Sequence, residues 1–143
     1  MTRIRPSFTT RQTSCLTVLL IDCRLHRIDM GFKRVLIANR GEIALRILRT
    51  LRDMGIEAAI IHGKEDRVSL PVMMSDIAYP NYCTNPLDSY LGIEAVVKAA
   101  KELECDAVHP GYGFLAENAH FVKRLAEEGI TFIGPSSEVI TLL

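Results

Sequence analysis

Short apolar runs alternate along the chain with longer segments whose apolar residues are spaced like one face of a helix. The first run, Val35 to Ala38, is uninterrupted, which is typical of a strand buried on both faces. Asn39 and Glu42 then match a capping box, and Gly55 stands where a left-handed C-terminal cap is expected. The segment between them predicts an amphipathic helix, because its apolar residues recur at helical steps: Ile43, Ile47, Leu51 and Met54.

The alternation of strand and helix continues to the end of the sequence. Pro71 interrupts residues 68–74, so only a short or broken helix fits there. Strands that alternate with helices through short connections predict an α/β fold, a Rossmann-like parallel sheet with helices on both faces. The further strands are expected at residues 56–61, 76–79, 106–108 and 130–133. The further helices are expected at residues 88–103, capped by Asp88 or Ser89, at residues 117–128, and from about residue 138.

Residues 1–29 differ in composition from the rest of the chain. They hold five arginines and two aspartates, with many serines and threonines, and no acidic residue precedes Asp22. This composition resembles that of an organelle transit peptide. Alternatively, Met30 is the true start, since Gly31-Phe32-Lys33 leads directly into the first strand. We favour the second interpretation, and divide the chain into an extension, residues 1–29, and one domain, residues 30–143, incomplete at its C-terminus.

The composition argues against several classes of function. The chain has 17 basic and 17 acidic residues, and the basic excess of residues 1–29 leaves the remainder slightly acidic, with no basic stripe. No nucleic acid partner is therefore expected. Cys15, Cys23, Cys83 and Cys105 form no C-x-x-C pair, so we expect reduced thiols without a zinc site or a disulfide framework. No apolar run reaches the length of a membrane span, so no membrane association is expected.

Candidate chemistry concentrates in one glycine-rich loop. In a sheet of this kind the ligand site lies at the carboxyl ends of the strands, where residues 39–41, 62–67 and 109–114 are predicted to meet. In the third loop, Gly111-x-Gly113-x-x-Ala116 matches the dinucleotide fingerprint, which makes an NAD(P)-binding oxidoreductase domain one hypothesis. Against it, the fingerprint belongs after the first strand, and no acidic residue follows the next strand to contact a ribose.

No catalytic set can be assembled from the sequence. It offers no Ser/His/Asp set, no H-E-x-x-H motif and no carboxylate cluster. His109 at a strand end and His120 on a helix stand where a structural, hydrogen-bonded histidine is more common than a base or a metal ligand. The residues alone therefore indicate a Rossmann-like domain with an anion-binding edge.

Four motifs carry a resemblance to a known family. They are I-A-N-R-G-E-I-A at Ile37–Ala44, S-Y-L at Ser89–Leu91, V-H-P-G-Y-G-F-L-A-E-N at Val108–Asn118 and F-I-G-P at Phe132–Pro135. In order and spacing they resemble the N-terminal, pre-ATP-grasp domain of biotin carboxylase, the ATP-grasp component of acetyl-CoA, propionyl-CoA and pyruvate carboxylases. The resemblance runs from about Lys33 to the end and supports Met30 as the start. It departs at Pro71, where relatives commonly carry histidine, and at Ala116, where serine is commoner.

The resemblance implies an ATP-dependent ligase. In this family ATP and bicarbonate give carboxyphosphate, and the released carbon dioxide is captured by the ureido nitrogen of biotin on a carrier. The implied cofactors of the full-length enzyme are ATP, Mg²⁺ or Mn²⁺, and carrier-bound biotin. The implied partners are the biotin carboxyl carrier, a carboxyltransferase subunit and a second copy in a homodimer. We expect a cytoplasmic location, or a mitochondrial one if residues 1–29 are a transit peptide.

The resemblance places few of the family's functional residues within this chain. Its nucleotide-binding lysines, metal-binding glutamates, catalytic base and catalytic arginine all fall beyond position 143. We therefore expect no catalytic residue and no metal site here, and a fragment that is inactive and binds no cofactor tightly. Tyr112-Gly113-Phe114 resembles the segment that borders the biotin and bicarbonate pocket. Arg46, Arg49 and Asp53 share the outer face of the first helix, which contributes to a homodimer in bacterial members but from spacing alone reads as a solvated surface.

Overall fold

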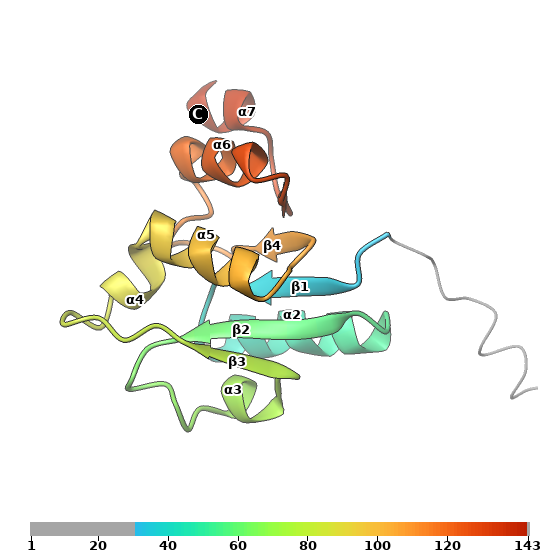
Figure 1. Ribbon diagram of the computed structural model, residues 1–143, viewed down its shortest axis with the longest axis vertical. Coiled ribbons are helices and arrows are strands. Elements are labelled where there is room, and N and C mark those ends of the chain that lie inside the picture. Colours follow the sequence, from blue (N-terminus) through green and yellow to red (C-terminus); the bar gives the residue numbers. More distant parts are fainter. Residues whose placement is uncertain (1–30, 143) are drawn as a thin grey trace, which may run out of the picture.

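The structure is a computed structural model that describes residues 31–142 (Figure 1). The predicted division between residues 1–29 and the domain therefore lies outside the described residues. The strands are β1 (Arg34–Ile37), β2 (Glu57–His62), β3 (Ile77–Pro80), β4 (Ala107–His109) and β5 (Thr131–Phe132). The helices are α2 (Gly41–Asp53), α3 (Leu70–Met74), α4 (Asp88–Leu91), α5 (Ile93–Glu102), α6 (Ala119–Glu127) and α7 (Ser137–Leu142).

The strands form one parallel sheet in the order β3-β2-β1-β4-β5. β1 is central, and its Leu36 pairs with Ala59 of β2 on one side and with Val108 of β4 on the other. The chain winds outward from β1 to β3 and then crosses to the other side of β1, so the winding direction switches between β1 and β4. The predicted Rossmann-like α/β class is confirmed, and the ligand site of such a sheet lies at this switch point.

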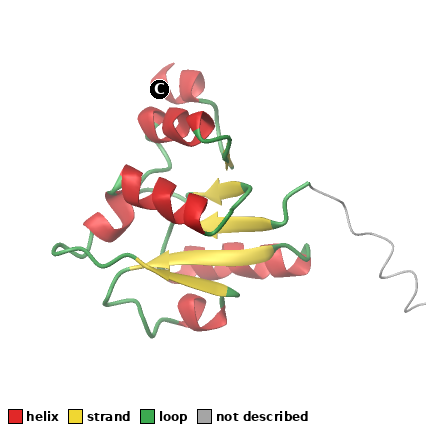
Figure 2. Cartoon of the chain, viewed as in Figure 1, coloured by secondary structure: helices red, strands yellow, loops and turns green. Residues whose placement is uncertain are grey.

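Helices cover both faces of the sheet (Figure 2). On one face α2 and α3 pack against Val35 and Ile37, and on the other α5 and α6 pack against Leu36 and Val108. Successive strand residues point to opposite faces, so the uninterrupted run from Val35 to Ala38 fills both cores, as its lack of polar positions predicted. None of the helices in the described part of the chain has the length and hydrophobicity needed to span a bilayer.

The first helix is confirmed, but its predicted cap is wrong. α2 begins at Gly41 with Arg40 as its N-cap, and no side chain hydrogen-bonds to its first turn. The capping box fails because the Asn39 side chain is directed to another part of the chain. Gly55 has φ +72°, which confirms the left-handed C-terminal cap. The buried stripe is also displaced from the predicted one and consists of Ala44, Ile47, Leu48 and Leu51.

The helix predicted at residues 88–103 is in fact two helices. Gly92 separates α4 from α5 because its backbone is extended, with φ −74° and ψ 98°. Neither Asp88 nor Ser89 is an N-cap, since Leu87 holds that position in α4 and no side chain caps the helix. The short helix expected around Pro71 is confirmed as α3, which carries the proline in its first turn, where a missing N–H costs no hydrogen bond.

Candidate functional site

Asn39, the last buried residue after β1, holds the loop that follows β4. Its side chain is 2% exposed. The amide Nδ2 donates to the carbonyl oxygens of Pro110 at 2.7 Å and Tyr112 at 2.9 Å. The amide Oδ1 accepts from the main-chain nitrogen of Arg40 at 2.8 Å. Both amide protons of this buried side chain are therefore hydrogen-bonded to carbonyl oxygens of the loop.

The loop from His109 to Phe114 turns through three residues with left-handed backbone. Gly111 has φ +68°, Gly113 has φ +65° and Phe114 has φ +45°. A Cβ on Gly111 would lie 2.6 Å from Nδ2 of Asn39, whereas one on Gly113 would meet nothing within 4 Å. Gly111 is therefore required by a close approach as well as by its conformation. Gly113 is required by conformation alone and faces open space.

Tyr90 supports the far end of the same loop. Its side chain is 2% exposed, and its ring packs on Phe114 with 5.4 Å between centroids. The hydroxyl donates to Oδ2 of Asp66 at 2.6 Å and accepts from the main-chain nitrogen of Gly63 at 3.1 Å. Burial, with the bond to Asp66, raises the pKa of Tyr90 far above neutral pH. The phenol therefore stays protonated and keeps donating.

Arg40 contacts both Asp66 and Tyr90 from the solvent side. Its guanidinium pairs with Oδ1 of Asp66 at 2.8 Å and lies 5.8 Å from the centroid of the Tyr90 ring. Arg40 comes from the first of the three loops expected at the sheet edge, and Asp66 comes from the second. Both contact Tyr90, which packs on Phe114 of the third loop. The three loops therefore meet, as the sequence predicted.

His109 is a structural part of the turn. The main-chain nitrogen of Gly111 donates to its Nδ1 at 3.0 Å, and burial lowers the pKa of the imidazole. An Nδ1 that accepts a hydrogen bond leaves the ring proton on Nε2 of the neutral form. This is the role that the position of His109 at a strand end favoured.

The glycine loop does not have the geometry of a dinucleotide site. Such a site needs a helix that begins at the glycine turn, so that its first N–H groups face the pyrophosphate. Here α6 begins only at Ala119, after Asn118 caps it by accepting from the main-chain nitrogen of Phe121. The loop therefore matches the dinucleotide fingerprint in sequence but not in structure.

The sequence matches the family described as "Biotin carboxylase, N-terminal domain" over residues 31–140. The chain belongs to this family. The 2-oxoglutarate carboxylase small subunit of Hydrogenobacter thermophilus is 49% identical over 112 residues, which cover 78% of this chain and 24% of that protein. The biotin carboxylase of Pseudomonas aeruginosa is 46% identical over 114 residues, which cover 78% of this chain and 25% of that protein.

Solved structures of biotin carboxylase domains share the fold. One is the dimer of the biotin carboxylase domain of H. thermophilus 2-oxoglutarate carboxylase, in complex with MgADP, ADP and bicarbonate. It is 50% identical with a TM-score of 0.75, and the match covers 78% of this chain and 24% of that one. The chain thus spans about a quarter of the length of each of these three relatives.

The residues that the biotin carboxylase resemblance singled out fall into two groups. Tyr112-Gly113-Phe114 lies at the switch point, whereas Arg46, Arg49 and Asp53 lie on the exposed face of α2. Within residues 31–142 none of these three charged side chains forms an ion pair. A groove of about 440 Å³ joins the two groups, since Arg46 and Tyr112 both line it. Its other walls are mainly apolar, with Phe32, Ile43, Ile47, Met54 and Ile133 among them.

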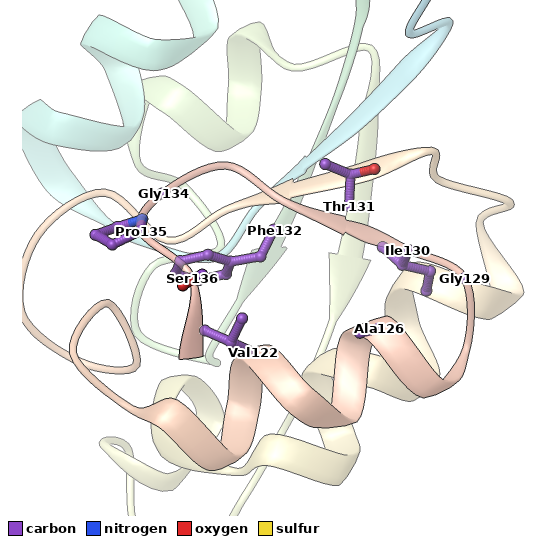
Figure 3. A pocket seen from close by; sticks show the side chains of 9 residues that line it. All are labelled: Val122, Ala126, Gly129, Ile130, Thr131, Phe132, Gly134, Pro135 and Ser136. Atoms are coloured by element: carbon purple, nitrogen blue, oxygen red, sulfur yellow. The ribbon is translucent and has the colours of Figure 1, made fainter. Parts of the chain in front are cut away.

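A second cavity, beside α6, contributes no chemistry. It also measures about 440 Å³ and lies between α6 and the segment that joins β5 to α7 (Figure 3). No charged side chain lines it. At its edge Gly134 sits so close to the ring of Phe132 that a Cβ would overlap the ring. The glycine of the F-I-G-P motif therefore serves local packing.

Sequence reasoning missed the parts played by Asn39, Asp66 and Tyr90. The sequence predicts Asn39 to be a helix cap, and it marks Tyr90 only as part of the S-Y-L motif. One signal could have found Asn39. A polar residue directly after a buried strand at the switch point must place its side chain among neighbouring loops. Asp66 lies in the polar loop that leaves β2, the strand next to β1, so an ion pair with Arg40 could have been anticipated.

Proposed function

We propose that this chain forms the N-terminal domain of a biotin carboxylase, a ligase that uses ATP and bicarbonate to carboxylate biotin on a carrier protein. The family membership of residues 31–140 supports this proposal. The observation that carries it is the Tyr112-Gly113-Phe114 loop, which stands at the topological switch point, where such sheets bind ligands. Its backbone is held by buried side chains, which is how a binding loop is kept in one conformation.

The loop is proposed to border the pocket for biotin and bicarbonate. Tyr112 is 63% exposed, so in the described residues its ring forms one wall of a site and no more. The remaining walls are proposed to come from the part of the relatives that this chain does not match, about three-quarters of their length. With such a division of the pocket, no catalytic residue is expected within this chain.

The full-length enzyme is proposed to use ATP with Mg²⁺ or Mn²⁺, but residues 31–142 do not fit these groups. They contain no cluster of three or more His, Cys, Asp or Glu side chains that could hold a metal ion. No helix begins at the glycine loop to receive a phosphate. We therefore derive no catalytic step through metal-bound ATP. We propose that the chain alone neither binds Mg-ATP tightly nor cleaves it.

The proposed assembly follows the same family. The partners of the full-length enzyme are the biotin carboxyl carrier, a carboxyltransferase subunit and a second copy of the enzyme. Arg46, Arg49 and Asp53 are proposed to contribute to the homodimer, and the description of the H. thermophilus biotin carboxylase domain as a dimer supports this assignment. The proposed location is the cytoplasm.

Titration of the purified ¹⁵N-labelled chain with ligands, followed by NMR, tests the proposal. Biotin and bicarbonate are expected to bind weakly, to the one wall of the pocket that this chain supplies, and to shift the main-chain amide resonances of Tyr112 to Phe114. NADH and Mg-ATP are expected to leave these resonances unchanged. Tight binding of NADH would overturn the assignment in favour of an oxidoreductase domain. Bicarbonate-dependent ATP cleavage by this chain would overturn the claim that it is inactive alone.

A further inference from the structure

We propose that Asn39 is the positioning residue of the ligand loop. It turns the Tyr112–Gly113 peptide so that the Gly113 N–H points out of the loop, as a hydrogen-bond donor for an oxygen atom of the ligand. The two ligands with such an oxygen are bicarbonate and the ureido carbonyl of biotin. The identity of the ligand rests on the proposed function, whereas the orientation of the peptide rests only on the contacts within this chain.

Peptide geometry links Asn39 to Gly113. The carbonyl oxygen of Tyr112 points at Nδ2 of Asn39, 2.9 Å away. No cis peptide bond occurs in residues 31–142, and in a trans peptide the C=O and the N–H point in opposite directions. The N–H of Gly113 must therefore point away from the buried Asn39 and toward solvent. Asn39 sets this direction without touching the ligand itself.

The Gly113 N–H is available for a ligand. Among residues 31–142 it has no hydrogen-bond acceptor, although the carbonyl oxygen of Gly113 accepts from the main-chain nitrogen of Ala116 at 2.8 Å. Gly113 is itself exposed, so its main chain is accessible to solvent. An exposed, unpaired donor on a fixed backbone is the arrangement used to recognise oxygen acceptors.

The loop has a second fixed point that keeps it from rotating about Asn39. Phe114, the residue after Gly113, packs on the ring of Tyr90, which is itself held by Asp66 and Gly63. The peptide between Tyr112 and Gly113 is therefore anchored on one side by two hydrogen bonds and on the other by a ring contact. Removal of the Asn39 donors alone frees the first side and leaves the second in place.

The wild-type chain provides the first test, because both carboxamide protons of Asn39 are engaged. We expect these protons to exchange with solvent at least about tenfold more slowly than those of Asn85. Asn85 is the internal control, since its Nδ2 makes an exposed bond to Oδ1 of Asp88 at 3.2 Å. Equal exchange rates for the two side chains would overturn the proposed clamp.

Asn39→Asp provides the second test, because it keeps the shape and the Oδ1 acceptor of Asn39 but removes both donors. We expect the ¹⁵N order parameter of Gly113 to fall from about 0.85 to below about 0.6. The matched control is Asn81→Asp, which removes a similar side-chain bond, from Nδ2 to the carbonyl oxygen of Ser89 at 2.8 Å. An unchanged order parameter in a folded Asn39→Asp chain would overturn the proposal. If that variant does not fold, the exchange rates of the wild-type carboxamide protons decide whether Asn39 holds the loop.

Ligand titrations separate this inference from the proposed function. Biotin and bicarbonate are added separately to the wild type, Asn39→Asp and Asn81→Asp. We expect the ligand that binds to shift the Gly113 amide in the wild type and in Asn81→Asp, with at least about tenfold weaker affinity in Asn39→Asp. Full affinity in Asn39→Asp would overturn the role of Asn39. If neither ligand shifts the wild type, the proposed function fails at this loop, while the order parameters still decide whether Asn39 holds the peptide.

Discussion

The side-chain amide of Asn39 donates to the main-chain carbonyl of Tyr112 at 2.9 Å, across a separation of 73 residues in the sequence. This bond joins the I-A-N-R-G-E-I-A segment to the V-H-P-G-Y-G-F-L-A-E-N segment. Each segment alone resembles an ordinary turn between a strand and a helix. Together they form one unit, in which a buried side chain after β1 holds the exposed backbone after β4.

Gly111 and Gly113 are expected to differ in their tolerance of alanine. Gly111→Ala would place a methyl group 2.6 Å from Nδ2 of Asn39, in addition to the cost of its φ of +68°. We expect this variant to lower the free energy of unfolding by about 3 kcal/mol. Gly113→Ala carries only the cost of its backbone conformation and is expected to lose about 1 kcal/mol. Urea unfolding measures both, and equal losses would contradict the close packing of Asn39 on Gly111.

Tyr90→Phe is expected to destabilise the chain although the ring and its contact with Phe114 are kept. The change removes the partner of Oδ2 of Asp66 and of the Gly63 N–H, and leaving such groups unpaired costs about 2 kcal/mol. The control is Tyr79→Phe, which removes a similar bond to Glu102 at an exposed position and is expected to cost less than about 0.5 kcal/mol. Thermal unfolding of both variants measures the difference, and a neutral Tyr90→Phe would show that the hydroxyl adds no stability.

The strands could be predicted because their signal is local. The run from Val35 to Ala38 has no polar position, and a strand buried on both faces needs none. The same holds for the end of α2, where Gly55 has a left-handed backbone conformation that residues other than glycine rarely adopt. These features depend on neighbours only a few residues away.

The roles of the polar residues could not be predicted, because distant partners decide them. An asparagine after a strand can cap the next helix or bind another loop, and both uses need the same side chain. Asn39 takes the second use because Pro110 and Tyr112 lie beside it in the fold. The break at Gly92 escaped prediction for a different reason. Glycine is tolerated within helices at a modest cost, so its presence alone did not decide between one helix and two.

Stability is expected to fall in acid, in part through Asp106. Its Oδ2 accepts from the main-chain nitrogens of Arg34 at 2.8 Å and Lys33 at 2.6 Å, and these bonds lower the pKa of the carboxyl. A pKa lowered in the folded state means that the stabilisation is present above the unfolded pKa of about 3.9 and is lost as pH falls below it.

Asp106→Asn keeps an acceptor oxygen but cannot titrate, so it isolates the contribution of this carboxylate. Urea unfolding between about pH 2.5 and pH 7 measures it, because the stability of the wild type should fall more steeply below about pH 4 than that of the variant. Parallel curves for the two proteins would show that the carboxylate of Asp106 contributes nothing to the acid dependence.

The exposed face of α2 is expected to govern self-association. Arg46, Arg49 and Asp53 lie there without ion-pair partners among the described residues, so they are free to pair across an interface. Arg49→Glu reverses one charge and is expected to weaken dimerisation by at least about tenfold, or 1.4 kcal/mol. Sedimentation equilibrium measures this effect. Arg67→Glu, at an exposed position outside α2, is the control, and equal association of the two variants would contradict the assignment of this face.

A chimeric enzyme tests the central claim most directly. Residues 31–140 of this chain would replace the matching segment of the P. aeruginosa biotin carboxylase, which is 46% identical over 114 residues. The measurement is ATP cleavage that depends on both bicarbonate and free biotin. We predict a rate within about tenfold of the parent enzyme, a barrier difference of about 1.4 kcal/mol. A folded chimera that binds Mg-ATP like the parent but shows no biotin-dependent cleavage would contradict the claim that this chain is a biotin carboxylase domain.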